Sequence, residues 1–375
     1  MFQEIRVDRV MTENEIRGWL RLSRLELSSK SSYSLIEHYK TPEAIFNASK
    51  DELSTFDWLT EKAVSKLTGP IPAAVEKDLA VLESKNINII PVTSDNYPSS
   101  LKQIYDPPVI LYVRGAFLES DRFAVGIVGS RRATNYGRSI TEKIARDLVH
   151  NGLVIVSGGA RGIDTSAHKS ALASNGRTIA VLGCGVDVNY PAENEKLYDA
   201  ISQKGAVISE FPLASAPEPW RFPPRNRLIS GLSIGVLVCQ SPEASGALIT
   251  AGYAAEQGKD VWAIPGNVDD ERNRGCHKLI KDGAKLVENV DDILEELGID
   301  SSEKRTSQMS FQIPPANLSV DEKNIIVMLS LEPIQIDEII TKSGLSASVA
   351  ASTLTLLEMK SIVRRLPGNA YVRVL

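Results

Sequence analysis

Four segments, three of which contain glycine, each placed where an apolar strand pattern gives way to a helical one, constrain the fold of this chain more than any other feature. They are residues 129–132, 157–164, 225–227 and 245–247. In an open parallel sheet, such loops lie at the carboxyl ends of the strands and converge on one crevice. Small residues let the backbone approach an anion, and helix N-termini direct N–H groups at it. We therefore expect a crevice that binds a phosphate-bearing ligand.

The middle of the chain predicts an α/β fold. Residues 80–298 alternate strand and helix patterns, with crossovers long enough for parallel pairing. Several strands are unbroken apolar runs, which is typical of strands covered on both faces. We predict a doubly wound, mostly parallel Rossmann-like sheet, with edge strands added at 87–92 and 109–113. The other expected strands are 123–128, 153–157, 178–182, 206–209, 234–239, 261–264 and 285–287, and the expected helices are 137–150, 165–173, 248–257, 276–282 and 291–297.

Two smaller modules flank the α/β domain, which we place at 79–298. Residues 1–78 show short helical patterns and predict a compact helical module, which we expect to be structural or to contact protein. Residues 299–317 are polar and predict a linker, and residues 318–375 predict a winged helix. Its third helix, 346–359, carries no Arg or Lys, so we expect this domain to bind protein rather than DNA.

Charge separates the middle of the chain from its flanks. The net charge is −5, yet residues 122–290 carry 20 Lys and Arg against 17 Asp and Glu. A locally basic crevice binds a polyanion even on an acidic protein. The three cysteines and four histidines are scattered without metal-ligand spacing, so we expect neither metal nor cofactor. The chain shows no membrane-spanning run of about 20 apolar residues and no secretory segment, which predicts a cytoplasmic protein.

Arginines and small residues share the four segments. The planar guanidinium forks of Arg131, Arg161, Arg225 and Arg227 suit phosphate. Cations at a helix N-terminus cost free energy unless an anion sits there, which favours an anion site at the first segment. Gly158, Gly159 and Gly162 permit crowded or left-handed backbone, the Ser157 hydroxyl can donate to phosphate, and Ser245 or Gly246 can cap the next helix.

A second pattern lies just before the third segment. Trp220, Arg221 and Phe222 interleave aromatic and basic groups, a combination that suits single-stranded nucleic acid because bases stack on rings while phosphates meet arginines. Either aromatic ring alone is equally consistent with a core residue.

These motifs, with 264–267 and 275–280 following in order, resemble the DNA-processing protein A (DprA/Smf) family, most strongly over residues 80–290. The resemblance implies a protein that binds and protects incoming single-stranded DNA, loads the RecA recombinase in natural transformation and homologous recombination, and forms a homodimer. It implies no chemical turnover. It also implies a sterile-alpha-motif-like N-terminal module and a C-terminal winged helix. The expected DNA-phosphate site comprises Gly129, Ser130, Arg131, Ser157, Gly158, Gly159, Arg161, Gly162, Arg221, Phe222, Arg225, Asn226, Arg227, Ser245 and Gly246.

One position departs from the family, and two other functions remain open. Relatives often have a basic residue where this chain has Ala244, and Arg221 or Lys259 are candidates to compensate. A nucleoside monophosphate phosphoribohydrolase on a related fold would need a glutamate shortly after its glycine loop, but the next acid here is Glu256. A nucleotide-sensing protein would fit the loops but would leave the aromatic–basic stretch and the winged helix without a use.

Overall fold

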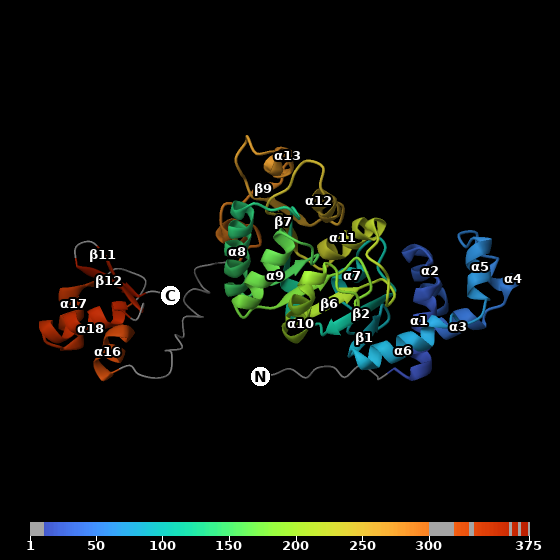
Figure 1. Ribbon diagram of the computed structural model, residues 1–375, viewed down its shortest axis with the longest axis horizontal. Helices are drawn as coiled ribbons and strands as arrows, with labels where there is room; N and C mark the ends of the chain where they lie inside the picture. Colours follow the sequence, from blue (N-terminus) through green and yellow to red (C-terminus); the bar gives the residue numbers. More distant parts are fainter. Residues whose placement is uncertain (1–10, 300–318, 330–333, 360–361, 367–368, 374–375) are drawn as a thin grey trace. The chain divides into compact units, whose positions relative to one another are not determined.

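The computed structural model describes residues 11–299, 319–329, 334–359, 362–366 and 369–373. It divides into two compact units, Met1–Lys304 and Arg305–Leu375 (Figure 1). The first unit holds six N-terminal helices and a large sheet, and the second holds the C-terminal helices. The expected linker lies outside the described residues except for Ile299.

The sheet of the first unit has nine strands in the order β1-β2-β6-β5-β4-β3-β7-β8-β9. From β6 to β9 all neighbours are parallel, whereas β2 pairs antiparallel with both β1 and β6. The predicted mostly parallel, doubly wound sheet is confirmed. The strands are β1 Ile87–Pro91, β2 Ile110–Gly115, β3 Ala124–Val128, β4 Val154–Ser157, β5 Thr178–Val181, β6 Ala206–Ser209, β7 Gly235–Val238, β8 Asp260–Ala263 and β9 Lys285–Leu286.

One strand prediction needs correction. Residues 109–113 were expected to form an edge strand, but β2 lies inside the sheet between β1 and β6. Tyr112 and Val113 are fully buried there, which explains why this segment is apolar on both faces. Of the two added strands, β1 is the one at the edge.

Helices cover both faces of the sheet. Val125 and Ile127 of β3 share a core with α8, α9 and α14, whereas Val128 belongs to a second core with α10, α11 and α12. This division follows from the strand geometry, because successive side chains point to opposite faces. The helices that follow β1 are α7 Ser99–Lys102, α8 Asn135–His150, α9 Ile163–Ala173, α10 Glu195–Lys204, α11 Phe222–Gly231, α12 Gly246–Glu256, α13 Arg274–Lys281 and α14 Val290–Glu296, with 3₁₀ helices η1 Glu119–Phe123, η2 Ala192–Asn194, η3 Pro219–Arg221 and η4 Glu271–Asn273.

Helix α11 corrects the interpretation of the third segment, residues 225–227. These residues were expected to form a loop, but they lie in the first turns of α11. Pro223 and Pro224 occupy the start of this helix, where proline is favoured because its missing N–H would have no intrahelical partner. The helix therefore presents its first turns, rather than a loop, to the carboxyl ends of the strands.

The strand order reverses at β3. β4 follows β3 in the chain and pairs on one side of it, while β7 pairs on its other side. The loops after β3 and β7 therefore meet at a topological switch point, where open α/β sheets bind ligands.

The N-terminal helices pack at the β1 and β2 end of the sheet (Figure 1). Leu20 and Leu35 of these helices share one buried core with Leu111 of β2. The expected domain boundary between residues 78 and 79 falls inside α6, and Asp78 forms an ion pair with Arg24 of α1. The helical module and the sheet are thus one unit. The helices are α1 Glu13–Arg24, α2 Ser29–Tyr39, α3 Pro42–Asn47, α4 Lys50–Leu53, α5 Glu61–Leu67 and α6 Ala74–Ser84.

The second unit has the winged-helix arrangement that the sequence predicted. Its small sheet has the order β10-β12-β11, with β10 between the first two of three helices whose core includes Ile325, Ile339 and Leu354. The elements are α16 Val320–Met328, β10 Ile334–Gln335, α17 Ile336–Ser343, α18 Ala347–Met359, β11 Val363–Leu366 and β12 Ala370–Arg373.

Candidate functional site

The four segments meet at the carboxyl end of the parallel strands. The Ser130 amide donates to the carbonyl of Gln240 after β7 at 2.7 Å, and the Ile163 amide donates to the carbonyl of Ser130 at 3.2 Å. On the other side, Asn226 Nδ2 of α11 donates to the carbonyl of Gly246 at 3.1 Å. The structure thus brings together the segments that the sequence singled out.

Two glycines make this close packing possible. Gly162 has φ +75°, and a side chain there would collide with the carbonyl oxygens of Ser130 and Arg131. At Gly158, a Cβ would lie 2.7 Å from Nη1 of Arg225. The first and second loops therefore approach one another at backbone distance, and the Arg225 side chain of α11 reaches the backbone of the second loop.

Arg225 lies beneath these loops as a buried cation. It is 4% exposed, and its Nη1 donates to the carbonyl of Gly158 at 2.6 Å and to that of Val181. Its Nε donates to Asn226 Oδ1 at 3.2 Å. These partners are neutral, and burial lowers the pKa of Arg225 although the charge of Asp164 opposes this shift. No carboxylate hydrogen-bonds directly to this guanidinium among the described residues, so its charge is offset only in part, by Asp164, and still favours an anion at these loops.

Two further titratable groups are buried next to Arg225. Burial raises the pKa of Asp164 to about 6, against the opposing charge of Arg225. Asp164 lies in the first turn of α9, which begins at Ile163 rather than at the expected residue 165, and it accepts from the Ala160 amide at 3.2 Å. Burial lowers the pKa of His168 to about 3, so its imidazole is neutral at pH 7. This neutrality agrees with a structural role for His168.

Exposed cations lie above the floor that these buried groups form. Arg131 is exposed, and its guanidinium carbon lies 5.1 Å from the centre of the Phe222 ring. Arg161 is also exposed and forms a two-point ion pair with Glu193, with Nη2 and Oε2 3.0 Å apart. Both guanidinium groups are accessible to a ligand from solvent, and only that of Arg161 already has an anionic partner among the described residues.

Two expected contact residues have side chains that are occupied by the protein itself. Arg227 is 3% exposed, and its guanidinium lies 2.6 and 2.7 Å from the two carboxylate oxygens of Glu210 and 2.8 Å from Asp106. Burial alone would lower the pKa of Arg227, but the two carboxylates outweigh it and raise the pKa. The hydroxyl of Ser157 donates to the carbonyl of Ile127 at 2.6 Å. Neither side chain has its main donors free for a phosphate.

A residue that the sequence did not single out organises the switch point. Gln240 is fully buried, accepts from the Thr134 amide at 2.9 Å and donates to Asn273 Oδ1 at 3.1 Å. It therefore joins the loop after β3 to the segment before α13. A polar residue directly after an apolar strand was the available signal for this role.

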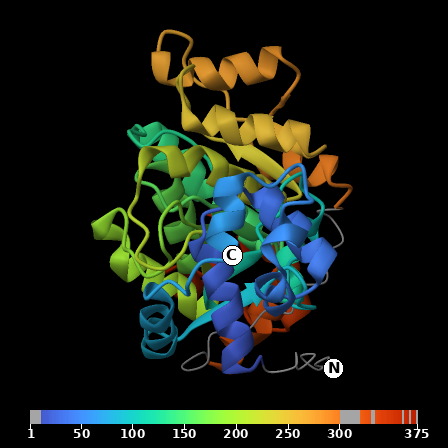
Figure 2. The ribbon, with the colours of Figure 1, turned by 90° about the vertical axis from the view of Figure 1, so that its right-hand side faces the viewer.

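A lysine side chain lies near Ala244, which stands just before α12. Lys278 Nζ of α13 lies 4.0 Å from Glu243 Oε1, one residue before Ala244. In both views α13 lies beside α12, the helix that starts at this corner (Figures 1 and 2). Lys278 joins Arg221 and Lys259 as a candidate to replace the missing basic residue.

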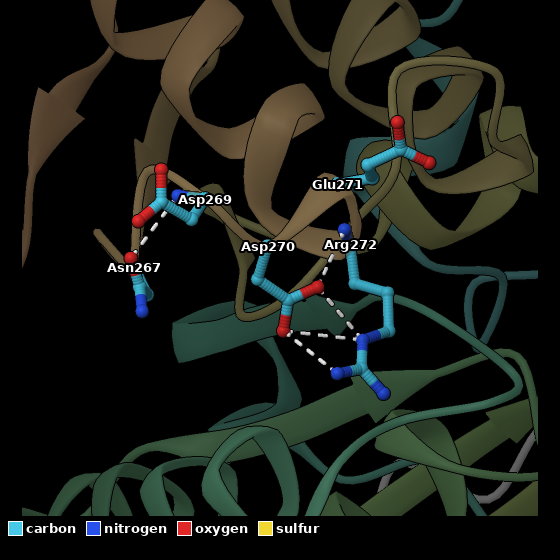
Figure 3. Close-up of a pocket in the computed structure, with 5 residues that line it drawn as sticks. All are labelled: Asn267, Asp269, Asp270, Glu271 and Arg272. Atoms are coloured by element: carbon cyan, nitrogen blue, oxygen red, sulfur yellow. Dashed lines mark hydrogen bonds and ion pairs between the residues drawn. The ribbon is translucent and has the colours of Figure 1, made fainter.

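A hollow elsewhere on the first unit has the wrong charge for a phosphate. It is lined by Asn267, Asp269, Asp270, Glu271 and Arg272 (Figure 3). Asp270 holds Arg272 through a two-point ion pair with a shortest distance of 2.8 Å. The lining carries three carboxylates and one guanidinium, so this hollow repels a polyanion. No cluster of three potential metal-binding side chains occurs among the residues that the structure describes.

The fold and the site together define a Rossmann-like α/β protein with arginines and glycine loops at its switch point and a separate winged helix. The chain belongs to the family described as DNA recombination-mediator protein A, whose model matches residues 88–298, and the model of the DprA winged helix domain matches residues 311–369. The family interpretation of the sequence is confirmed.

Named relatives and solved structures agree with this family. The chain is 32% identical to protein Smf of Synechocystis over 97% of this chain and 100% of the relative, and 47% identical to DNA processing protein DprA of Streptococcus pneumoniae over 55% and 72%. The crystal structure of S. pneumoniae DprA matches with a TM-score of 0.67 at 36% identity, covering 75% of this chain and 97% of that one. A Helicobacter pylori DprA structure, reported for its single-stranded DNA binding mode, matches at 0.52 and 32% identity over 57% and 96%.

Within the part of the chain that the structure describes, every helix is too short or too polar to cross a bilayer.

Proposed function

We propose that this protein binds single-stranded DNA in the switch-point crevice and holds it mainly through its phosphates. The observation that carries this proposal is the buried Arg225, which lies beneath two glycine loops with neutral partners and with Arg131 exposed above it. A phosphate above this floor would meet guanidinium groups and backbone amides together, as anions do at helix N-termini and glycine loops.

The aromatic groups beside the crevice favour a single strand over a duplex. The half-buried ring of Phe222 has its centre 5.1 Å from the guanidinium carbon of Arg131 and 5.7 Å from the centre of the Tyr190 ring. Unpaired bases expose their faces and stack on such rings, whereas a duplex buries those faces. A strand can thus place a base on Phe222 while its phosphates lie over the loops.

The proposed contact set follows from this geometry. It omits the side chains of Ser157 and Arg227, which are engaged within the protein, and that of Arg221, which is buried against the rings of Phe211 and Trp220. It comprises Gly129, Ser130, Arg131, Gly158, Gly159, Arg161, Gly162, Phe222, Arg225, Asn226, Ser245 and Gly246.

The wider role that we propose is the family's: protection of incoming DNA in natural transformation, loading of RecA, a homodimeric state and a cytoplasmic location. Its support is the set of DNA-processing relatives together with the single-stranded DNA binding reported for the H. pylori neighbour.

We also propose that the protein acts by binding and not by chemical turnover. A phosphoribohydrolase would need a carboxylate close to the glycine loop at the start of α12. Glu256 is the last residue of that helix, ten residues after Gly246. At about 1.5 Å per residue the two ends of the helix are roughly 15 Å apart, so Glu256 is badly placed for glycosidic cleavage at this loop.

Fluorescence anisotropy with labelled single strands and blunt duplexes, across a salt series, tests the proposal. We expect tighter binding of single strands, with a log–log salt slope of about −0.7 per phosphate neutralised. Arg131→Ala should weaken binding by about tenfold to a hundredfold and leave Tm nearly unchanged. Arg272→Ala in the acidic hollow is the matched control and should bind like the wild type.

Two results would contradict the proposal. One is equal affinity for duplex and single strand, and the other is unchanged binding by Arg131→Ala. Incubation with nucleoside monophosphates tests the enzymatic alternative, because release of free base would show turnover.

A further inference from the structure

Trp220 is an exposed aromatic side chain next to the crevice that the proposed contact set does not use. It lies on η3, directly before α11, and is 60% exposed. Its neighbour Phe222 belongs to the crevice, two positions further along the chain. An indole this exposed gains little from the protein core and keeps aromatic surface open to a ligand.

A buried arginine holds the indole in place. The guanidinium carbon of Arg221 lies 4.5 Å from the centre of the Trp220 ring and 4.9 Å from that of Phe211. The Phe211 and Trp220 rings are nearly perpendicular, at 85°, with centres 6.5 Å apart. Cation–π contact of this kind orients the ring before any ligand arrives. The ring is thus fixed and still open to solvent.

The charge at this place favours a base rather than a phosphate. Arg221 is buried, and its Nε has no hydrogen-bond partner in the described part of the chain. Its Nη2 lies 3.6 Å from Glu26, whose carboxylate is exposed and would repel a phosphate. What Trp220 offers to a ligand is therefore an aromatic face strengthened by a guanidinium behind it.

We propose that Trp220 is a second base-stacking platform, which takes a base of the same single strand next to the one on Phe222. This inference rests on the proposed function. The Cα atoms of two residues that are two positions apart are separated by at most about 7 Å, so a strand with one base on Phe222 passes within reach of Trp220.

Binding of a short single-stranded oligothymidylate to the full chain tests this platform. Stacking of one base on an aromatic ring accounts for roughly a fivefold to hundredfold change in affinity, so Trp220→Ala should weaken binding by that factor. Trp220→Phe retains an aromatic face and should bind nearly as well as the wild type. Trp58→Ala removes another exposed indole, 42% exposed on the N-terminal module, and should leave binding unchanged.

An abasic scan separates stacking from a structural effect. A single abasic position is moved along the oligonucleotide, and affinity is measured for the wild type and Trp220→Ala. The wild type should lose affinity at one position to which the variant is insensitive, because the lost base and the lost ring belong to one contact. In a Trp58→Phe background, DNA should quench the tryptophan fluorescence, since Trp19 and Trp262 are buried.

The outcomes distinguish the two proposals. If the wild type does not bind single strands, both fail. If it binds and Arg131→Ala weakens binding, but Trp220→Ala binds normally or keeps the wild-type abasic profile, only the platform is wrong. In that case the exposed indole is left to serve as a protein contact.

Discussion

Replacing Arg227 with alanine should destabilise the protein without lowering its affinity for DNA. The guanidinium of Arg227 is 3% exposed and is bound by Glu210 and Asp106. Its loss leaves the nearly buried carboxylate of Glu210 without its cation. Removing one partner of a buried ion pair costs about 3–5 kcal/mol, because the other charge stays buried and unpaired. For a unit of this size the melting temperature should fall by roughly 5–8 °C.

Thermal unfolding and DNA titration at a temperature where the variant is folded measure the two effects separately. Arg131→Ala is the matched comparison, since it should change affinity and spare stability. The double variant Arg227→Met/Glu210→Leu should recover part of the lost stability, because it removes both charges. A variant Arg227→Ala that keeps its melting temperature but binds DNA ten times more weakly would refute this reasoning and return Arg227 to the contact set.

Three further predictions concern other parts of the molecule. Glu193→Gln removes the carboxylate that pairs with Arg161 and frees its guanidinium for DNA. The affinity for single strands should therefore rise by about twofold to fivefold in anisotropy titrations, and a fall in affinity would contradict the proposed contact between Arg161 and phosphate. The lowered pKa of His168 means that its contribution to stability is full above about pH 6.5 and is lost as pH falls toward 3. The free energy of unfolding of His168→Asn, measured with urea between pH 4 and 7, should therefore rise less steeply with pH than that of the wild type, by up to about 1.4 kcal/mol per pH unit. An unchanged pH dependence would exclude His168 as its source. Deleting residues 315–375 should leave affinity for single strands within about tenfold of the full chain, and a larger loss would place DNA contacts in the winged helix.

The sequence predicted the sheet and the convergence of the loops because both depend on local pattern. Apolar runs ending in small residues identify parallel strands and their carboxyl ends, and parallel pairing brings those ends to one edge. Gly162 illustrates this, since it comes directly before α9 and in the structure permits the contact with Ser130. The motif order also identified the family correctly.

The motif alone could not predict which of its arginines is neutralised within the protein. Arg225 and Arg227 stand two residues apart, yet one lies under the crevice with neutral partners and the other is neutralised. The neutralising groups come from far along the chain: Glu210 is 17 residues away and Asp106 is 121 residues away. Only the tertiary fold brings these carboxylates to Arg227, so the local pattern gave both arginines the same role.

The contact between Gly162 and the carbonyls of the first loop limits how this protein can diversify. A side chain at 162 would force the loops apart, and the positive φ adds a backbone penalty, so every non-glycine substitution there should be selected against. Positions at the rim, such as Trp220, Arg161 and Glu193, have room to vary because they face solvent. In a saturation-mutagenesis experiment, adaptation to strands of different composition should therefore accumulate at the rim, while the floor of the crevice stays invariant.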